Sequence, residues 1–185
     1  MQKGGGDMKK NEMKELVCSA IASKDLCRAF FKYDTNYRYC FPLLASSRLF
    51  LSANENDFSI DGFSVRRFSD LKKISLRRDK YTEIVKSENI FDCVSLPKID
   101  LTDWQSVFLS LQASPQNIII EKESLDEKEC EFAIGRIEKV QKNKVLFKYF
   151  DADGVWQDGL LEIPFSQITS VTFGSRYVEI FSKYV

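Results

Sequence analysis

The sequence predicts a mainly β (α+β) protein of two tandem small β-barrels, each preceded by one α-helix. Three observations lead to this prediction. A segment of the 185-residue chain resembles another segment 97 positions later, aromatic residues make up 13% of the chain, and the matched apolar residues alternate with period two. Alternation and aromatic side chains favour strands. We therefore predict a flexible tail at 1–10, copy one at 11–87, a linker at 88–99 and copy two at 100–185.

The internal similarity is an ordered series of matches. Leu49-Phe50 aligns with Leu146-Phe147, Asp61-Gly62 with Asp158-Gly159, and Phe68-Ser69 with Phe165-Ser166. After one deletion near Asp79, Tyr81 aligns with Tyr177 and Glu83-Ile84 with Glu179-Ile180. Asp-Gly is typical of a turn, because glycine accepts a positive φ. We interpret the series as a duplication.

Each copy is predicted to begin with a helix. Apolar residues at helical spacing define the first one: Met13, Leu16, Val17, Ala20 and Ile21. The second has the set Leu101, Trp104, Val107, Phe108 and Leu111. We predict Asn11 as the N-cap of the first helix, and Thr102 with Gln105 as a capping box for the second.

Strands follow each helix. In copy one we predict strands at 27–32, 37–43, 48–52, 58–68, 73–77 and 81–86. In copy two the matching strands are at 117–122, 132–140, 144–150, 155–164, 170–173 and 177–182. Hairpin turns are expected at 142–144 and 151–154, and a single helical turn is expected at 68–71 and at 165–168. Strands this short leave exposed edges, which closure into a small barrel removes.

The order of helix, bent strands, short helical turn and last strand resembles the Sm-like fold, a branch of the SH3-like small barrels. The Phe-Ser-x-Leu/Ile turns at 68–71 and 165–168 carry this resemblance together with the element order. Sm proteins bind RNA through a motif in which Arg or Lys precedes Gly near the final strands. Here Gly174 follows Phe173, and copy one has Arg77 at the equivalent position. RNA binding and ring assembly are therefore not carried over from the family.

The amino-acid composition argues against a catalytic or metal-binding function. The chain has no histidine, which removes the commonest general base and metal ligand. Its five cysteines are widely spaced, lack a CxxC pair and lie beside apolar residues, so we expect buried free thiols in a reducing cytoplasm. We predict no catalytic residue, no metal site and no cofactor. No targeting segment is seen, and no apolar stretch is long enough for a membrane helix.

A basic run in copy one is the most suggestive local feature. It consists of Arg66, Arg67, Lys72, Lys73, Arg77, Arg78 and Lys80, whose counterparts in copy two are mostly uncharged. Residues 1–99 hold 18 basic and 13 acidic side chains, against 9 and 14 in the remainder. The run is a candidate nucleic-acid-binding surface. The alternatives are a solvated strand face or charge pairing between the two halves.

The sequence suggests two classes of function and a third, weaker one. The leading hypothesis is a cytoplasmic, non-enzymatic module that binds a protein or peptide through barrel edges or the groove between the barrels. The alternative is nucleic-acid binding by the basic face of copy one. The third is an enzyme with a carboxylate or lysine site between the barrels. An exposed, continuous basic face favours the second hypothesis, whereas pairing with acids of copy two argues against it.

Overall fold

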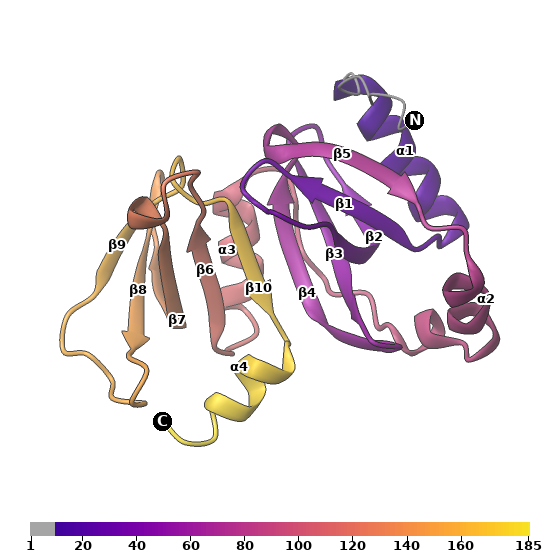
Figure 1. Cartoon of the computed structure of the whole chain (residues 1–185). Coiled ribbons are helices and arrows are strands. Elements are labelled where there is room, and N and C mark those ends of the chain that lie inside the picture. The colour runs from indigo at the N-terminus through magenta and orange to yellow at the C-terminus, as the bar shows by residue number, and fades with distance from the viewer. Residues whose placement is uncertain (1–9) are drawn as a thin grey trace.

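The computed structural model describes residues 10–185, apart from the side chain of Cys93 (Figure 1). The predicted tail lies outside the described residues except for Lys10, where the first helix begins. Strands dominate the described chain and four α-helices accompany them, which confirms the mainly β, α+β class. No helix within residues 10–185 is long and apolar enough to cross a membrane.

The first half contains two helices and five strands. They are α1 (Lys10–Ser23), β1 (Cys27–Phe31), β2 (Arg38–Ala45), β3 (Leu49–Asn56), β4 (Ser59–Arg67), β5 (Leu71–Leu76) and α2 (Lys80–Ser87). A 3₁₀ turn, Phe68–Asp70, joins β4 to β5 at the predicted helical turn. The predicted linker contains another 3₁₀ turn, Ile90–Cys93.

The second half repeats this series of elements. They are α3 (Trp104–Gln112), β6 (Ile118–Lys122), β7 (Glu131–Val140), β8 (Lys144–Phe150), β9 (Leu161–Pro164), β10 (Ser170–Phe173) and α4 (Arg176–Phe181). Only the last four residues of the strand predicted at 155–164 form β9. The preceding loop is organised by Asp151, whose side chain accepts hydrogen bonds from the backbone N–H groups of Asp153 and Val155.

All ten strands form one antiparallel sheet in the order β5-β1-β2-β3-β4-β10-β6-β7-β8-β9. The sheet is open, with β5 and β9 at its edges, so the predicted closed barrels are not present. The reason lies at the junction of the halves, where β4 pairs with β10 from Ser170↔Arg66 to Phe173↔Phe63. Each half satisfies one of its edges with the other half instead of closing on itself.

The two halves share strand order and register. In the first half the order from the free edge to the junction is β5-β1-β2-β3-β4. In the second half the order from the junction to the free edge is β10-β6-β7-β8-β9. A bulge interrupts β2·β3 between Pro42 and Leu44, and another interrupts β7·β8 between Ile137 and Lys139. After the bulge both hairpins continue with two pairs, which places Leu51 opposite Leu44 and Leu146 opposite Lys139. The sequence alignment of Leu49 with Leu146 is therefore two residues out of register, on the correct face of the strand.

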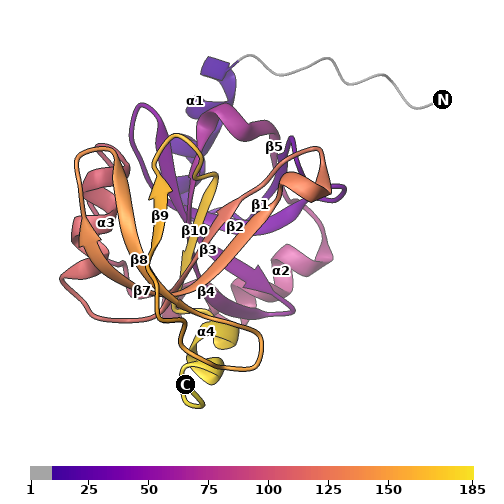
Figure 2. The same ribbon diagram turned by 90° about the vertical axis from the view of Figure 1, so that its left-hand side faces the viewer.

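The largest core is shared between the halves. Residues of α3 (Trp104, Val107, Phe108 and Leu111) pack with β3 and β4 residues such as Leu51 and Val65, and with β6 and β10 residues such as Ile120 and Val171. A second core lies under α1 in the first half, and a smaller one lies beside α4 in the second. Helices α1 and α4 sit at opposite ends of the molecule (Figures 1 and 2).

A polar strip separates the two smaller cores on the other face of the sheet. Because side chains alternate along a strand, residues between the core positions of β4, β10 and β6 share this face. We call them the junction strip: Ser64, Arg66, Ser170, Thr172 and Glu121. Arg66 lies opposite Phe50 of the first-half core, and Thr172 lies opposite Ile119 of the second-half core.

Two predicted strands are helices. Segments 81–86 and 177–182 form α2 and α4. Asp79 accepts a hydrogen bond from the Thr82 N–H, and Ser175 accepts one from the Val178 N–H, so each helix has a side-chain N-cap. Their aromatic and β-branched residues suggested strands, but the cap and one buried Val in each helix determine the conformation.

The predicted caps of the two leading helices are also wrong. Asn11 lies inside α1, which begins one residue earlier. Asp103, rather than Thr102, caps α3 by accepting a hydrogen bond from the Ser106 N–H at 2.8 Å. The Thr102 hydroxyl instead donates to Asp100.

Candidate binding surfaces at the junction of the two halves

The seven basic residues predicted as one surface lie in different surroundings. Arg66 is buried in the junction strip, and Arg67 lies at the end of β4. Lys72 and Lys73 are exposed on the edge strand β5. Arg77 lies among tyrosines, whereas Arg78 and Lys80 are exposed next to the start of α2. The structure therefore does not unite the seven side chains in one continuous exposed face.

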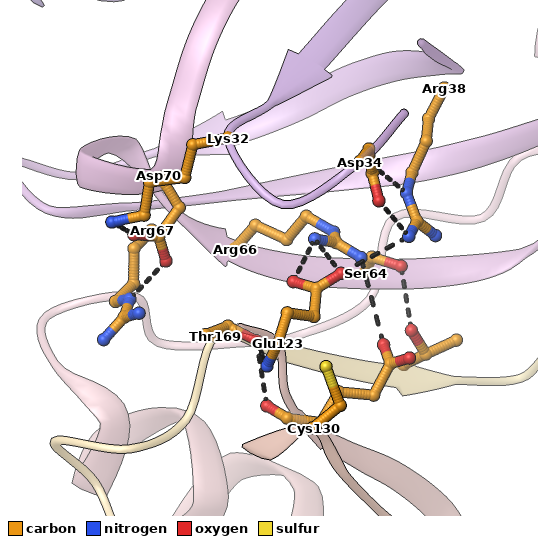
Figure 3. A network of polar contacts seen from close by, with 12 residues as sticks. Lys32, Asp34, Arg38, Ser64, Arg66, Arg67, Asp70, Glu123, Cys130 and Thr169 are labelled. Atoms are coloured by element: carbon orange, nitrogen blue, oxygen red, sulfur yellow. Dashed lines mark hydrogen bonds and ion pairs between the residues drawn. The ribbon is translucent and has the colours of Figure 1, made fainter. Parts of the chain in front are cut away.

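Arg66 is neutralised by acids of the second half. The residue is 3% exposed. Its Nη1 lies 2.8 Å and 3.1 Å from the two carboxylate oxygens of Glu123, and its Nη2 lies 3.9 Å from Glu121 (Figure 3). The guanidinium also stacks 4.4 Å from the centroid of the Phe31 ring. For this residue the charge-pairing interpretation is confirmed, and its side chain is not available to a ligand.

Further ion pairs extend from both ends of this contact. Arg38 donates to both carboxylate oxygens of Asp34 and also to Glu123, and the hydrogen bonds to Asp34 raise the pKa of Arg38. Arg67 and Lys32 both contact the buried carboxylate of Asp70 (Figure 3). The hydrogen bond to Asp70 raises the pKa of Lys32. Of these ion pairs, Arg38–Glu123 joins the two halves, whereas the pairs with Asp34 and Asp70 lie within the first half.

A groove opens across the junction at the α3 side of the molecule. We call it the junction groove; its volume is about 670 Å³. It lies between α1, the turn before β3 and the 3₁₀ turn of the first half, and the start of α3 and the β7–β8 turn of the second. The charged residues that line it are Lys10, Lys14, Arg48, Arg67, Lys142 and Asp103.

The rim of this groove is cationic. Lys10, Arg48 and Lys142 are exposed, and none of them forms an ion pair with another residue of the 10–185 segment. Lys14 donates to the Ser47 carbonyl oxygen at 2.5 Å. Arg67 contacts Asp70 and the Ser166 carbonyl oxygen. The one acid among the described lining residues, Asp103, is occupied as the N-cap of α3, so these residues carry an excess of positive charge.

Three aromatic side chains form the floor of the groove. Trp104 and Phe68 are buried, at 8% and 6% exposure. Phe165 stacks on Phe108, with ring centroids 5.6 Å apart and planes inclined by 8°. Because these rings are mostly covered by the protein, the groove offers apolar contact and little open ring face on which a base can stack.

A tyrosine cluster occupies the other side of the first half. The Arg77 guanidinium lies 4.1 Å and 3.7 Å from the ring centroids of Tyr39 and Tyr81. Phe58 stacks on Tyr81, with centroids 4.2 Å apart. The Tyr81 hydroxyl donates a hydrogen bond to buried Glu55. Burial, reinforced by this hydrogen bond, raises the pKa of Tyr81 to about 12.

The cysteines fall into two classes. Cys27 and Cys40 are buried free thiols, as predicted, but Cys18 and Cys130 are exposed. Burial raises the pKa of Cys40 to about 11, and it also raises the pKa of Cys27. Neither buried thiol is poised to ionise near neutral pH. The expectation for Cys93 lies outside the described side chains.

Sequence reasoning found Arg67 but missed the other cations of the groove. Lys10, Lys14, Arg48 and Lys142 come from three separate segments, and no local pattern connects them. Within the described residues no group of three or more Cys, Asp or Glu side chains is arranged to hold a metal ion. No family model, curated protein or solved structure matches the chain.

Proposed function

We propose that this protein is a non-enzymatic interaction module that holds an acidic peptide segment of a protein partner in the junction groove. The observation that carries the proposal is the groove itself, where cations from both halves that have no ion-pair partner within residues 10–185 surround an apolar floor. A segment with Asp or Glu beside Leu or Phe complements both features. Charge complementarity speeds association, and the apolar contact contributes affinity.

The groove is a better candidate than the sheet edges. Strand β5 carries Lys72 and Lys73 on its exposed positions, and β9 is four residues long and ends in Pro164. Lysines, short strands and proline are features by which proteins discourage pairing at an edge. The proposal therefore assigns binding to the groove formed where the halves meet.

The proposal treats each half as one module of a tandem pair related to the Sm-like small barrels. It is supported by the common strand order and by the bulges at equivalent positions in the two halves. A cytoplasmic location belongs to the same proposal. Ring assembly and the RNA-binding motif of that family form no part of it.

A second candidate function is single-stranded nucleic-acid binding by the first half. Tyr37 and Phe58 are 43% and 39% exposed at the ends of the tyrosine cluster, and the cations Arg78 and Lys80 are exposed on the same half. Aromatic rings beside cations can stack successive bases. The pairing of Arg66 and Arg67 with acids weakens this alternative.

Fluorescence anisotropy with two labelled probes tests the proposal. One probe is a peptide of alternating Glu and Leu, and the other is single-stranded oligothymidine. We expect the double variant Arg48→Glu/Lys142→Glu to weaken peptide binding by about tenfold, because two rim charges are reversed. The control Lys72→Glu/Lys73→Glu reverses two exposed charges on β5 and should change peptide affinity by less than about twofold.

Three results would argue against the groove. The first is no saturable binding of the peptide, and the second is an equal loss in the control variant. The third is tighter binding of oligothymidine that is lost in Tyr37→Ala/Phe58→Ala, which favours the nucleic-acid alternative.

A further inference from the structure

A second pocket crosses the junction on the polar face of the sheet. Its volume is about 450 Å³, and it shares no lining residue with the junction groove. Ser64 and Thr172 of the junction strip form part of its wall, which also includes residues of β2, β3 and β6, Asp61 of β4, Tyr37 before β2 and Ser175 after β10. We call it the acidic pocket. Both halves are needed to form it, because Thr172 and Glu121 belong to the second half and its other charged residues belong to the first.

The charge of this pocket is negative. Its charged lining residues are Glu55, Asp61, Glu121 and Arg38. Arg38 is held by Asp34 and Glu123, neither of which lines the pocket, so its positive charge is already balanced. Glu121 lies 3.9 Å from Arg66 and also interacts electrostatically with Arg38, and its side chain is 26% exposed. Two tyrosines, Tyr37 and Tyr39, form a wall beside these carboxylates.

Hydrogen-bond donors in the pocket are largely used, whereas acceptors remain. The Asn54 amide donates to the Ser64 hydroxyl at 2.9 Å, and the hydroxyls of Ser64 and Thr172 bond to each other at 3.0 Å. Asp61 uses one carboxylate oxygen to accept the Arg176 N–H at 2.7 Å, which leaves its second oxygen.

Glu55 gives an independent sign of unbalanced negative charge. The residue is 6% exposed, and its Oε1 accepts hydrogen bonds from the Phe58 N–H and the Tyr81 hydroxyl. Its Oε2 is buried and has no hydrogen-bond partner among residues 10–185. A buried carboxylate oxygen without a donor is costly, and its field reaches the adjoining pocket through a medium of low dielectric constant.

We infer that the acidic pocket binds a small organic cation that carries several N–H donors, namely a primary amine or a guanidinium compound. Such a ligand supplies the donors and the positive charge that the pocket lacks. Arg28 already lies over the rings of Tyr37 and Tyr39, and Arg77 lies over Tyr39, so recognition of the ligand is assigned to the carboxylates rather than to the tyrosines. This site is independent of the proposed peptide groove and takes a ligand of the opposite charge.

Isothermal titration calorimetry with agmatine tests this inference, because agmatine carries both an ammonium and a guanidinium group. We expect saturable binding of one molecule per chain. Glu121→Gln removes a carboxylate charge, and Asn56→Lys places a tethered ammonium at an exposed position of the pocket wall. Each should weaken agmatine binding at least about tenfold. Glu138→Gln, an exposed position of β7 outside the pocket, should leave binding unchanged.

The inference is overturned if agmatine does not bind saturably to the intact chain, or if a neutral diol of similar length binds equally well. Unchanged affinity in folded Asn56→Lys would also overturn it, and this variant decides the matter should Glu121→Gln fail to fold. Tighter binding of an arginine-containing peptide than of agmatine would assign the pocket to a partner's side chain instead. None of these results bears on the peptide groove, which Arg48→Glu/Lys142→Glu tests separately.

Discussion

At the scale of single residues, neighbours in space decide what a charge does. Arg66 and Arg78 are indistinguishable members of one basic run in the sequence. In the structure Arg66 is buried against Glu123, whereas Arg78 is exposed. A buried guanidinium must be paired, because the cost of removing it from water is large. The same residue type is therefore part of the junction at one position and available to solvent at another.

Neutralising Glu123 should expose this dependence. Glu123→Gln leaves the Arg66 charge buried without its main partner, and we expect a loss of about 3 kcal/mol in the free energy of unfolding. The measurement is urea-induced unfolding followed by circular dichroism. As a control, Glu83→Gln breaks the exposed pair with Lys80 and should cost less than about 0.5 kcal/mol. Equal losses in both variants would contradict a special role for the buried pair.

Tyr81 should make stability depend on pH in the alkaline range. Its pKa is raised from 10.0 to about 12, first by burial and then by the hydrogen bond to Glu55. The folded state therefore keeps the phenol protonated at a pH where the unfolded chain loses the proton. This contribution is fully present below pH 10 and is lost as the pH rises through 12.

The test compares Tyr81→Phe with the natural chain. Between pH 10 and 12 the free energy of unfolding should fall less steeply in the variant. Absorbance titration should also show the loss of one late-ionising tyrosine. Identical pH dependence in the two proteins would show that Tyr81 titrates normally.

At the scale of elements, positions were predicted more reliably than types. The strands from β1 to β5 lie at the predicted positions, although β2 and β3 contain continuous buried runs and do not alternate. Helices α2 and α4 were predicted as strands. The error is the same in both halves, because the two segments occupy equivalent positions. Their sequences are short and rich in aromatic and β-branched residues, and only the caps at Asp79 and Ser175 mark a helix start.

The paired glycines Gly62 and Gly159 give a matched test at this scale. Their Asp-Gly pairs are typical of turns, yet both lie inside predicted strands. Gly62 does lie within β4, with φ +71°, and a Cβ there would approach the Ser175 nitrogen to 2.5 Å. Gly159 has open space around its Cβ position. We expect Gly62→Ala to lower the free energy of unfolding by about 2–3 kcal/mol and Gly159→Ala to change it by less than about 0.5 kcal/mol.

Urea unfolding of both glycine variants checks this expectation. An unchanged free energy of unfolding in Gly62→Ala would mean that β4 and the segment after β10 can move apart without loss of stability. Such a result would place the tight contact between the halves elsewhere along the junction.

At the scale of the whole molecule, the two halves share one sheet and one core. The sheet is continuous through β4·β10, and Leu51 and Val65 of the first half share a core with Trp104, Phe108 and Val171 of the second. An isolated half would expose this core and one more sheet edge. We therefore expect neither half to be stable alone.

A single unfolding transition is the measurable consequence. Trp104 and Trp156 report on the second half through fluorescence, while labelling of the buried thiols of Cys27 and Cys40 reports on the first. The midpoints of these two urea-induced transitions should coincide. Separate midpoints would mean that the halves behave as independent domains and that the shared core contributes little to cooperativity.

The candidate surfaces show where prediction from sequence ends. Arg67 was identified because it belongs to a run of basic residues, and a run is visible along the chain. The sequence does not predict that Arg48 and Lys142 line one groove, since they lie in different halves and face each other only across it. The acidic pocket has the same origin, because Glu55 and Glu121 come from strands of different halves.

The sequence by itself determined the mainly β class, the two leading helices and the positions of most strands, because these depend on local periodicity and turn residues. Only the tertiary structure decided that the halves join through β4 and β10 into one open sheet, that Arg66 is buried, and which charges line the groove and the pocket. Backbone pairing at a sheet edge carries little sequence information, since the hydrogen-bonding groups are the same in every residue.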